Sequence, residues 1–152
     1  MPTTDYFQVS QTLTVTNGVY SVADVVGGLL TFANVSRGPG RRSEINQVTL
    51  TCTVGIAYEL WLFASDIATP AADNAVFALV QADISMCKGV IAIPSTSFLV
   101  AQTAFAMSVV YPTLPLIFSC VATTLYGYLK ATATTTPATT VMVIGIAGYM
   151  LD

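Results

Sequence analysis

Apolar and polar residues alternate along the first half of the chain. In QVSQTLTVT, residues 8–16, Val9, Leu13 and Val15 share one face, while Ser, Thr and Gln fill most of the remaining positions. The stretch INQVTLTCTV, residues 45–54, alternates in the same way. A period of two residues is typical of a strand with one exposed face. The pattern therefore predicts half-exposed strands in both stretches, and the Asn-Gly turn signal follows the first of them.

Shorter apolar runs separated by turn signals predict the remaining elements. The expected strands are 25–33, 57–65, 88–94, one or two within 97–111, 123–135 and 139–151. Residues 113–120 form either a strand or a crossing, and residues 75–87 either a short helix or a linker over the edge of the sandwich. Eight or nine strands with almost no amphipathic helix predict an all-β fold. We expect an antiparallel jelly-roll-like β-sandwich, a single domain over residues 1–152 with a short N-terminal arm at 1–7.

Two adjacent glycines interrupt one of these strands. They are Gly27 and Gly28 in YSVADVVGGLLTFANV, residues 20–35. Glycine weakens the interior of a strand, because it packs no side chain and is flexible in the unfolded chain. The pair therefore indicates either a close approach by a neighbouring chain or a bulky ring, or a bulge that bends the strand.

The last two strands carry large apolar residues on both faces. An antiparallel sheet normally buries one face and exposes the other to water. Leaving several large side chains exposed forfeits about 1.5–3 kcal/mol each, so the second face needs a cover. The pattern favours a subunit interface, and the alternative is a loop or the 75–87 segment folded over that face. The candidate interface residues are Tyr126, Tyr128, Ile144 and Ile146.

Few residues of the chain are charged. Charged residues make up 9% of it, hydrophobic residues make up 54%, and the net charge is −3. An acidic chain of this kind is not expected to bind nucleic acid. No residue between Lys88 and Lys130 is charged, but prolines 94, 112 and 115 interrupt this stretch. Since a membrane-spanning helix needs about 20 continuous apolar residues, we expect no membrane insertion.

The sequence has few residues suited to catalysis or metal binding. It has no histidine, which is the commonest general base and metal ligand. Cys52, Cys87 and Cys120 match no zinc pattern, and we expect Cys52 and Cys120 to be buried thiols. Asp66 and Asp73 flank a loop that has too few alternating oxygen ligands for a typical calcium site. We therefore predict no catalytic residue, no cofactor and no metal.

One loop is basic. It is VSRGPGRRSE, residues 35–44, and it contains Arg37, Arg41 and Arg42, three of the five basic residues of the chain. Its glycines and proline predict a turn. Either this loop is a solvated tip, or its arginines bind carboxylates on an acidic neighbouring protein.

Three stretches of the chain resemble a family of known proteins. They are YSVADVVGGLLTFANV, WLFASDIATPAADNAVFALVQADISMCKGVIAI and TTLYGYLKATATTTPATTVMVIGIAGYMLD. They are similar to small β-rich structural proteins of tailed bacteriophages, in which a strand like AGDVVGGLLTF, a DN-A-x-F element and a TTLYG strand follow one another. The similarity covers most of the chain but involves structural residues, so it transfers no active site.

The resemblance implies a protein of the virion, assembled in the bacterial cytoplasm. The expected function is that of a capsid cement (decoration) protein, a homotrimer on the capsid surface that binds the major capsid protein and stabilises the shell. Arg37, Arg41 and Arg42 are then the candidate capsid contacts. The alternative is a head-fibre, tail or host-binding module of the virion.

Overall fold

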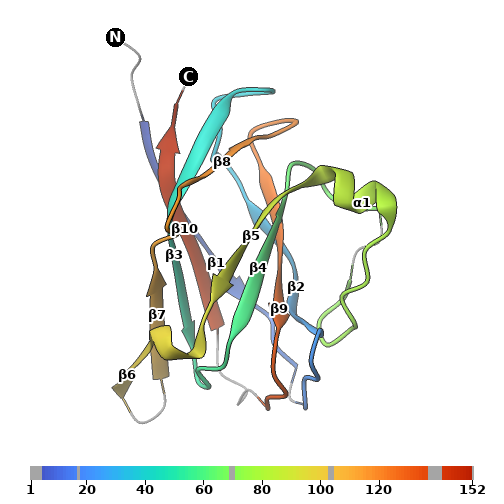
Figure 1. Ribbon diagram of the computed structural model, residues 1–152, viewed down its shortest axis with the longest axis vertical. Coiled ribbons are helices and arrows are strands. Elements are labelled where there is room, and N and C mark those ends of the chain that lie inside the picture. The colour runs from blue at the N-terminus through green and yellow to red at the C-terminus, as the bar shows by residue number, and fades with distance from the viewer. Residues whose placement is uncertain (1–4, 17, 69–70, 103–104, 137–141, 152) are drawn as a thin grey trace.

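The protein is built almost entirely of β-strands (Figure 1). The structure, a computed structural model, describes residues 5–16, 18–68, 71–102, 105–136 and 142–151. The strands in these residues are β1 (Asp5–Leu13), β2 (Val25–Phe32), β3 (Arg42–Cys52), β4 (Tyr58–Phe63), β5 (Cys87–Ile93), β6 (Phe98–Gln102), β7 (Phe105–Val110), β8 (Leu116–Ser119), β9 (Leu125–Ala131) and β10 (Met142–Met150). A short helix, α1 (Gln81–Met86), and a 3₁₀ turn, η1 (Ser95–Ser97), complete the described elements.

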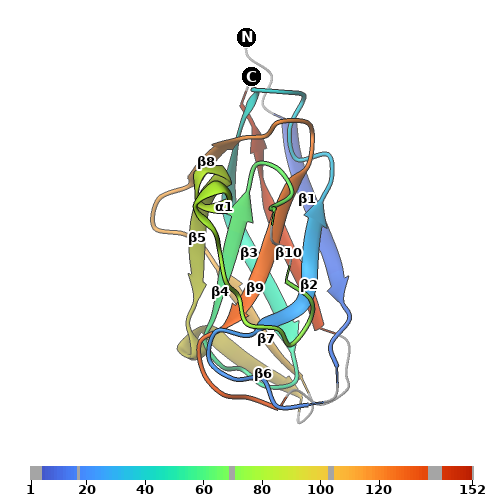
Figure 2. The ribbon, with the colours of Figure 1, turned by 90° about the vertical axis from the view of Figure 1, so that its right-hand side faces the viewer.

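The strands form two antiparallel sheets that pack face to face as one sandwich, as the sequence predicts. The larger sheet has the order β1-β10-β3-β7-β6, and β8 also pairs with β3. The smaller sheet has the order β2-β9-β4-β5. Figure 2 shows the smaller sheet toward the viewer with the larger one behind it. The chain crosses repeatedly between the sheets, because β1 and β3 lie in the larger sheet whereas β2 and β4 lie in the smaller one.

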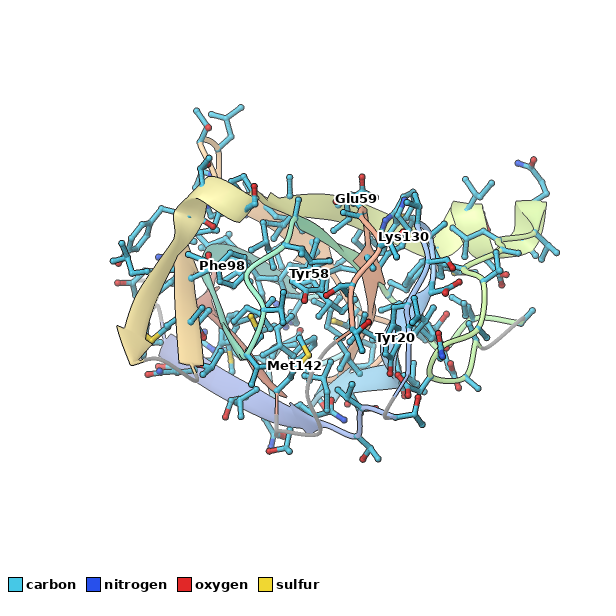
Figure 3. The ribbon with its side chains drawn as sticks, turned by 90° about the horizontal axis from the view of Figure 1, so that it is seen from below. Tyr20, Tyr58, Glu59, Phe98, Lys130 and Met142 are labelled. Atoms are coloured by element: carbon cyan, nitrogen blue, oxygen red, sulfur yellow. The ribbon has the colours of Figure 1, made fainter. Side chains whose placement is uncertain are left out.

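Alternate residues of both sheets fill the space between them. Leu50 on β3, Ile144 on β10 and Leu60 on β4 are fully buried in this core. Aromatic rings close the lower end of the sandwich. There Phe98 packs edge-on against Tyr58 at a centroid distance of 6.2 Å. Figure 3 shows these two residues at that end together with Tyr20 and Met142.

Several element boundaries differ from the expected ones. Strand β1 begins at Asp5, so residues 5–7 pair with β10 and do not form an arm. Strand β3 begins at Arg42, inside the expected basic loop, because residues 42–45 pair with β8. The stretch 97–111 holds two strands, and 113–120 contains a strand. The helix of 75–87 is confirmed only over six residues.

The double glycine forms a bulge in β2. Val26 pairs with Leu129 and Leu29 with Tyr128, so the two glycines between them have no partner of their own on β9. Gly27 and Gly28 have φ angles of +81° and +73°, which residues with a Cβ adopt at a cost. A Cβ on Gly27 would also lie 2.5 Å from the side chain of Leu13. The bulge reading is therefore correct, and the closely approaching side chain comes from the same chain.

Candidate interaction surfaces

The two candidate interface residues on β10 lie inside the protomer. Ile144 and Ile146 are 0% and 1% exposed and belong to the core between the sheets. The opposite face of β10 carries Gly145 and Ala147 next to polar residues of β1 and β3. It also carries Tyr149, which is 37% exposed and packs edge-on against Tyr6. The interface assignment is therefore wrong for Ile144 and Ile146.

The candidate residues on β9 are covered by another part of the same chain. We call the segment between β4 and α1 the strap (residues 64–80, described except for 69–70). Phe77 of the strap lies 5.6 Å from the ring of Tyr128, and Phe63 on β4 lies 6.2 Å from it. Tyr128 is fully buried, and Tyr126 packs half-buried against the same cluster. The alternative of a covering segment is therefore correct for Tyr128, whose burial raises its pKa to about 12.

A carboxylate of the strap, that of Asp73, connects the strap to β2. Asp73 accepts hydrogen bonds from the backbone N–H groups of Gly27 (2.6 Å) and Thr16 (2.8 Å) and from the hydroxyl of Tyr20 (2.7 Å). Burial by itself raises the pKa of Asp73, but the hydrogen bonds from Gly27, Tyr20 and Thr16 outweigh burial and lower that pKa. Asp73 is therefore a structural residue that positions the bulge.

A second carboxylate joins two separate parts of the strap. Asp83 in α1 is 1% exposed and accepts hydrogen bonds from the backbone N–H groups of Ala68 (2.6 Å) and Val80 (3.3 Å). The outer side of the strap leaves Val76 67% exposed. The strap thus covers the aromatic face of the smaller sheet and is held in place by two internal carboxylates.

The described residues contain no group of three Cys, Asp or Glu side chains close enough to hold a metal ion. In the loop between Asp66 and Asp73, the carboxylate of Asp73 is engaged with backbone and hydroxyl donors. The three cysteines are free thiols. Cys52 and Cys120 are buried as expected, and burial raises the pKa of each thiol to about 11.

The three candidate capsid-contact arginines lie close together in the chain but differ in their surroundings. Arg37 forms an ion pair with Asp5 at 2.8 Å, which fastens the loop to the start of β1. Arg41 has an exposed side chain in the loop, and Arg42 is exposed at the first position of β3. This loop lies at the end of the sandwich from which both termini emerge (Figure 1).

An apolar groove along β5 was not predicted from the sequence. It has a volume of about 530 Å³ and lies between β5 and the loop that joins β7 to β8. Val90 and Ala92 line one side, and the other side includes Tyr111 and Leu114, which are 70% and 81% exposed. The uncharged stretch between Lys88 and Lys130 is the one sequence signal that marks this region. This signal does not show which apolar residues are exposed and which are buried.

No family model matches the chain, and the curated proteins include no relative with significant sequence similarity. Among the described residues, no helix has the length and apolar character needed to span a bilayer.

Proposed function

We propose that this chain is a non-enzymatic structural protein of a bacteriophage particle, a capsid cement protein that binds the assembled shell. The order of the strands is the observation that carries the proposal. The sheets run β1, β10, β3 and then β7 or β8, and β2, β9, β4, β5. We interpret this order as a jelly roll, an architecture used by many viral capsid domains. The resemblance of three stretches to phage structural proteins supports the same class.

A cement protein acts by thermodynamic linkage. A protein that binds the assembled shell but not its free subunits shifts the assembly equilibrium toward the shell. Several weak attachments on one cement particle then add their effects through avidity. With Tyr128, Ile144 and Ile146 buried inside one protomer, the fold supplies no three-fold contact from these residues. Binding of the assembled shell therefore does not depend on these residues.

The end that carries the basic loop is the proposed shell-facing end. Arg41 is exposed there, Arg42 is exposed next to it, and the ion pair between Arg37 and Asp5 fixes the loop to the sandwich. A guanidinium group binds a carboxylate through two parallel hydrogen bonds. The partner that fits is an acidic patch on the major capsid protein.

Reconstitution on empty shells tests this function. Purified chain is mixed with shells that lack it, and co-sedimentation and the disassembly temperature of the shells are measured. We expect saturable binding and a higher disassembly temperature. Arg41→Glu should weaken binding by about tenfold or more, because one charge-assisted hydrogen-bond pair contributes about 1.5–3 kcal/mol, whereas Arg41→Lys keeps the charge and serves as the control.

Binding to tails, fibres or host cells, with none to shells, would contradict the cement role and favour the alternative of a head-fibre, tail or host-binding module. Equal binding by the Arg41→Glu and Arg41→Lys variants would leave shell binding in place but contradict the assignment of the shell-facing end.

A further inference from the structure

The two outer strands of the smaller sheet are β2 and β5, and β2 is closed along its outer edge. The backbone N–H of Val25 donates to Ala75 of the strap (2.8 Å), and that of Gly27 donates to Asp73. Further along, the N–H of Thr31 donates to the side chain of Gln11 on β1 (2.5 Å). The bulge adds a kink to this edge. Proteins protect edge strands in these ways, because free backbone groups can pair with another chain.

Among the described residues, the outer edge of β5 along Val90–Ile93 pairs with no backbone, and the loop joining β7 to β8 lies beside it across the groove. Within the described part of the chain, β5 pairs with β4 alone. Its charged residue, Lys88, lies near its beginning, and Pro94 follows its last residue. The irregularity in its pairing with β4 falls at Cys87–Gly89. The stretch Val90–Ile93 is therefore a regular, uncharged strand edge of the kind that recruits another strand.

The apolar groove lies beside this same edge. The loop joining β7 to β8 projects past β5 and forms the far wall of the groove (Figure 2). Tyr111 and Leu114 on this loop are largely exposed, and Val90 on the strand is 42% exposed. An added strand would therefore pair with the backbone of β5 along one edge, and one of its faces would lie against the apolar side chains of the loop.

We propose that β5 pairs in antiparallel fashion with β5 of a second copy of this chain, about a two-fold axis. The pairing joins two four-stranded sheets into one of eight strands and brings the two 111–115 loops together. An antiparallel pair of identical strands has two-fold symmetry, so one edge serves both partners and the assembly closes. With Ile91 facing its own copy, Lys88 lies opposite Pro94, and the two lysines do not face each other.

The charge of the surface argues for a second copy as the occupant. No residue from 89 to 129 is charged, so the groove surfaces of two copies meet without repulsion, and Lys88 lies only at the end of the paired stretch. A partner with charged residues along its edge would lose their hydration in the groove and gain no ion pair. In charge, this neutral surface therefore suits a second copy of itself.

The small size of the groove surface indicates how tightly two copies should bind. Eleven residues line the groove, fewer than the roughly 20–30 per partner of a standard interface. An interface at the small end of the range forms a weak complex, so we expect a dissociation constant on the order of 1–10 µM.

Sedimentation equilibrium of the full chain between about 0.5 and 200 µM, a range spanning that constant, tests the pairing. We expect the mass to rise from 16.0 kDa toward twice that value. Leu114→Asp and Val90→Lys should each raise the dissociation constant at least tenfold. Val22→Asp is the control and should have no effect, because Val22 is 61% exposed and lies just before β2, at the edge of the smaller sheet opposite β5.

A monomer at every concentration would overturn the proposal, and so would a trimer, which would instead agree with the state implied by the resemblance. A dimer that neither groove variant weakens would overturn it as well. Circular dichroism shows whether each variant is folded. Because the measurement uses no shells, its outcome is separate from that of the shell-binding experiment.

Discussion

β2 and β5 are the two outer strands of one sheet, but their outer edges have different surroundings. The edge of β2 is occupied by the strap, by Asp73 and by Gln11, whereas the edge of β5 faces an open apolar groove. The strap that closes the first edge also covers Tyr128. Tyr128 therefore needs no partner subunit to cover it, and the open apolar surface of this sheet lies at its opposite edge.

Substitution in the bulge that closes the β2 edge should destabilise the protein most. In Gly27→Ala the new Cβ would lie 2.5 Å from the buried side chain of Leu13 at a φ of +81°. We expect a loss of about 3–4 kcal/mol in the free energy of unfolding, from backbone strain and overpacking together. Gly28→Ala is the matched control, because its nearest atom, the backbone nitrogen of Asp73, lies at 3.7 Å.

The control variant keeps the backbone strain alone, which corresponds to about 1–2 kcal/mol. Urea denaturation of both variants measures the difference. Equal losses for Gly27→Ala and Gly28→Ala would mean that the close approach of Leu13 does not constrain the strand.

The next effect concerns the carboxylate that joins the strap to β2. Asp73→Ala removes the acceptor for the donors of Thr16, Tyr20 and Gly27. Leaving partly buried donors without an acceptor corresponds to about 2 kcal/mol of stability. Asp66→Ala changes an exposed carboxylate of the same segment and should cost less than about 0.5 kcal/mol. Denaturant titrations that place the two variants at the same stability would contradict the structural role of Asp73.

Acid should weaken the same contact. The hydrogen bonds to Asp73 lower the pKa of its carboxyl below the ordinary value of 3.8. A group with a lowered pKa in the folded state contributes stability above the unfolded pKa and loses it as pH falls through the folded pKa. The stability difference between the wild type and Asp73→Asn should therefore shrink below about pH 4. A difference that is constant from about pH 5 to pH 2 would argue against a charged Asp73 in the fold.

The smallest effect concerns an ion pair on the outer face of the same sheet. Glu59 lies 2.6 Å from Lys130 and accepts a hydrogen bond from the indole N–H of Trp61 at 2.9 Å. Its partners lower its pKa, the hydrogen bond from Lys130 first. Half-exposed pairs contribute little, so Glu59→Gln should cost about 0.5 kcal/mol. A loss as large as that of Asp73→Ala, measured by urea denaturation, would show that this ion pair contributes as much as the contact of Asp73 does.

Local patterning was enough to predict most of the architecture. The alternation in residues 8–16 and 45–54 correctly indicated strands of an antiparallel sandwich, because one face of each is buried. It also correctly placed Cys52 in the core. The double glycine was correctly linked to a bulge, since no other residue adopts those angles as easily.

What covers each face could not be predicted from period-two patterns. Ile144 and Val143 both look apolar in the sequence, and only the assembled sheets decide which of them faces the core. Phe77 belongs to a segment with no regular secondary structure, so its contact with Tyr128 left no periodic signal. The β5 groove depends on where the 111–115 loop passes, which is a consequence of β8 pairing with β3.

Amide hydrogen exchange followed as a function of protein concentration tests most directly whether the two edges differ. We expect peptides that cover Val90–Ile93 to exchange more slowly at about 200 µM than at about 1 µM, concentrations on either side of the expected dissociation constant. Peptides that cover Val25–Phe32 should exchange at the same rate at both concentrations. Unchanged exchange in β5, or slowing in β2 instead, would contradict the account.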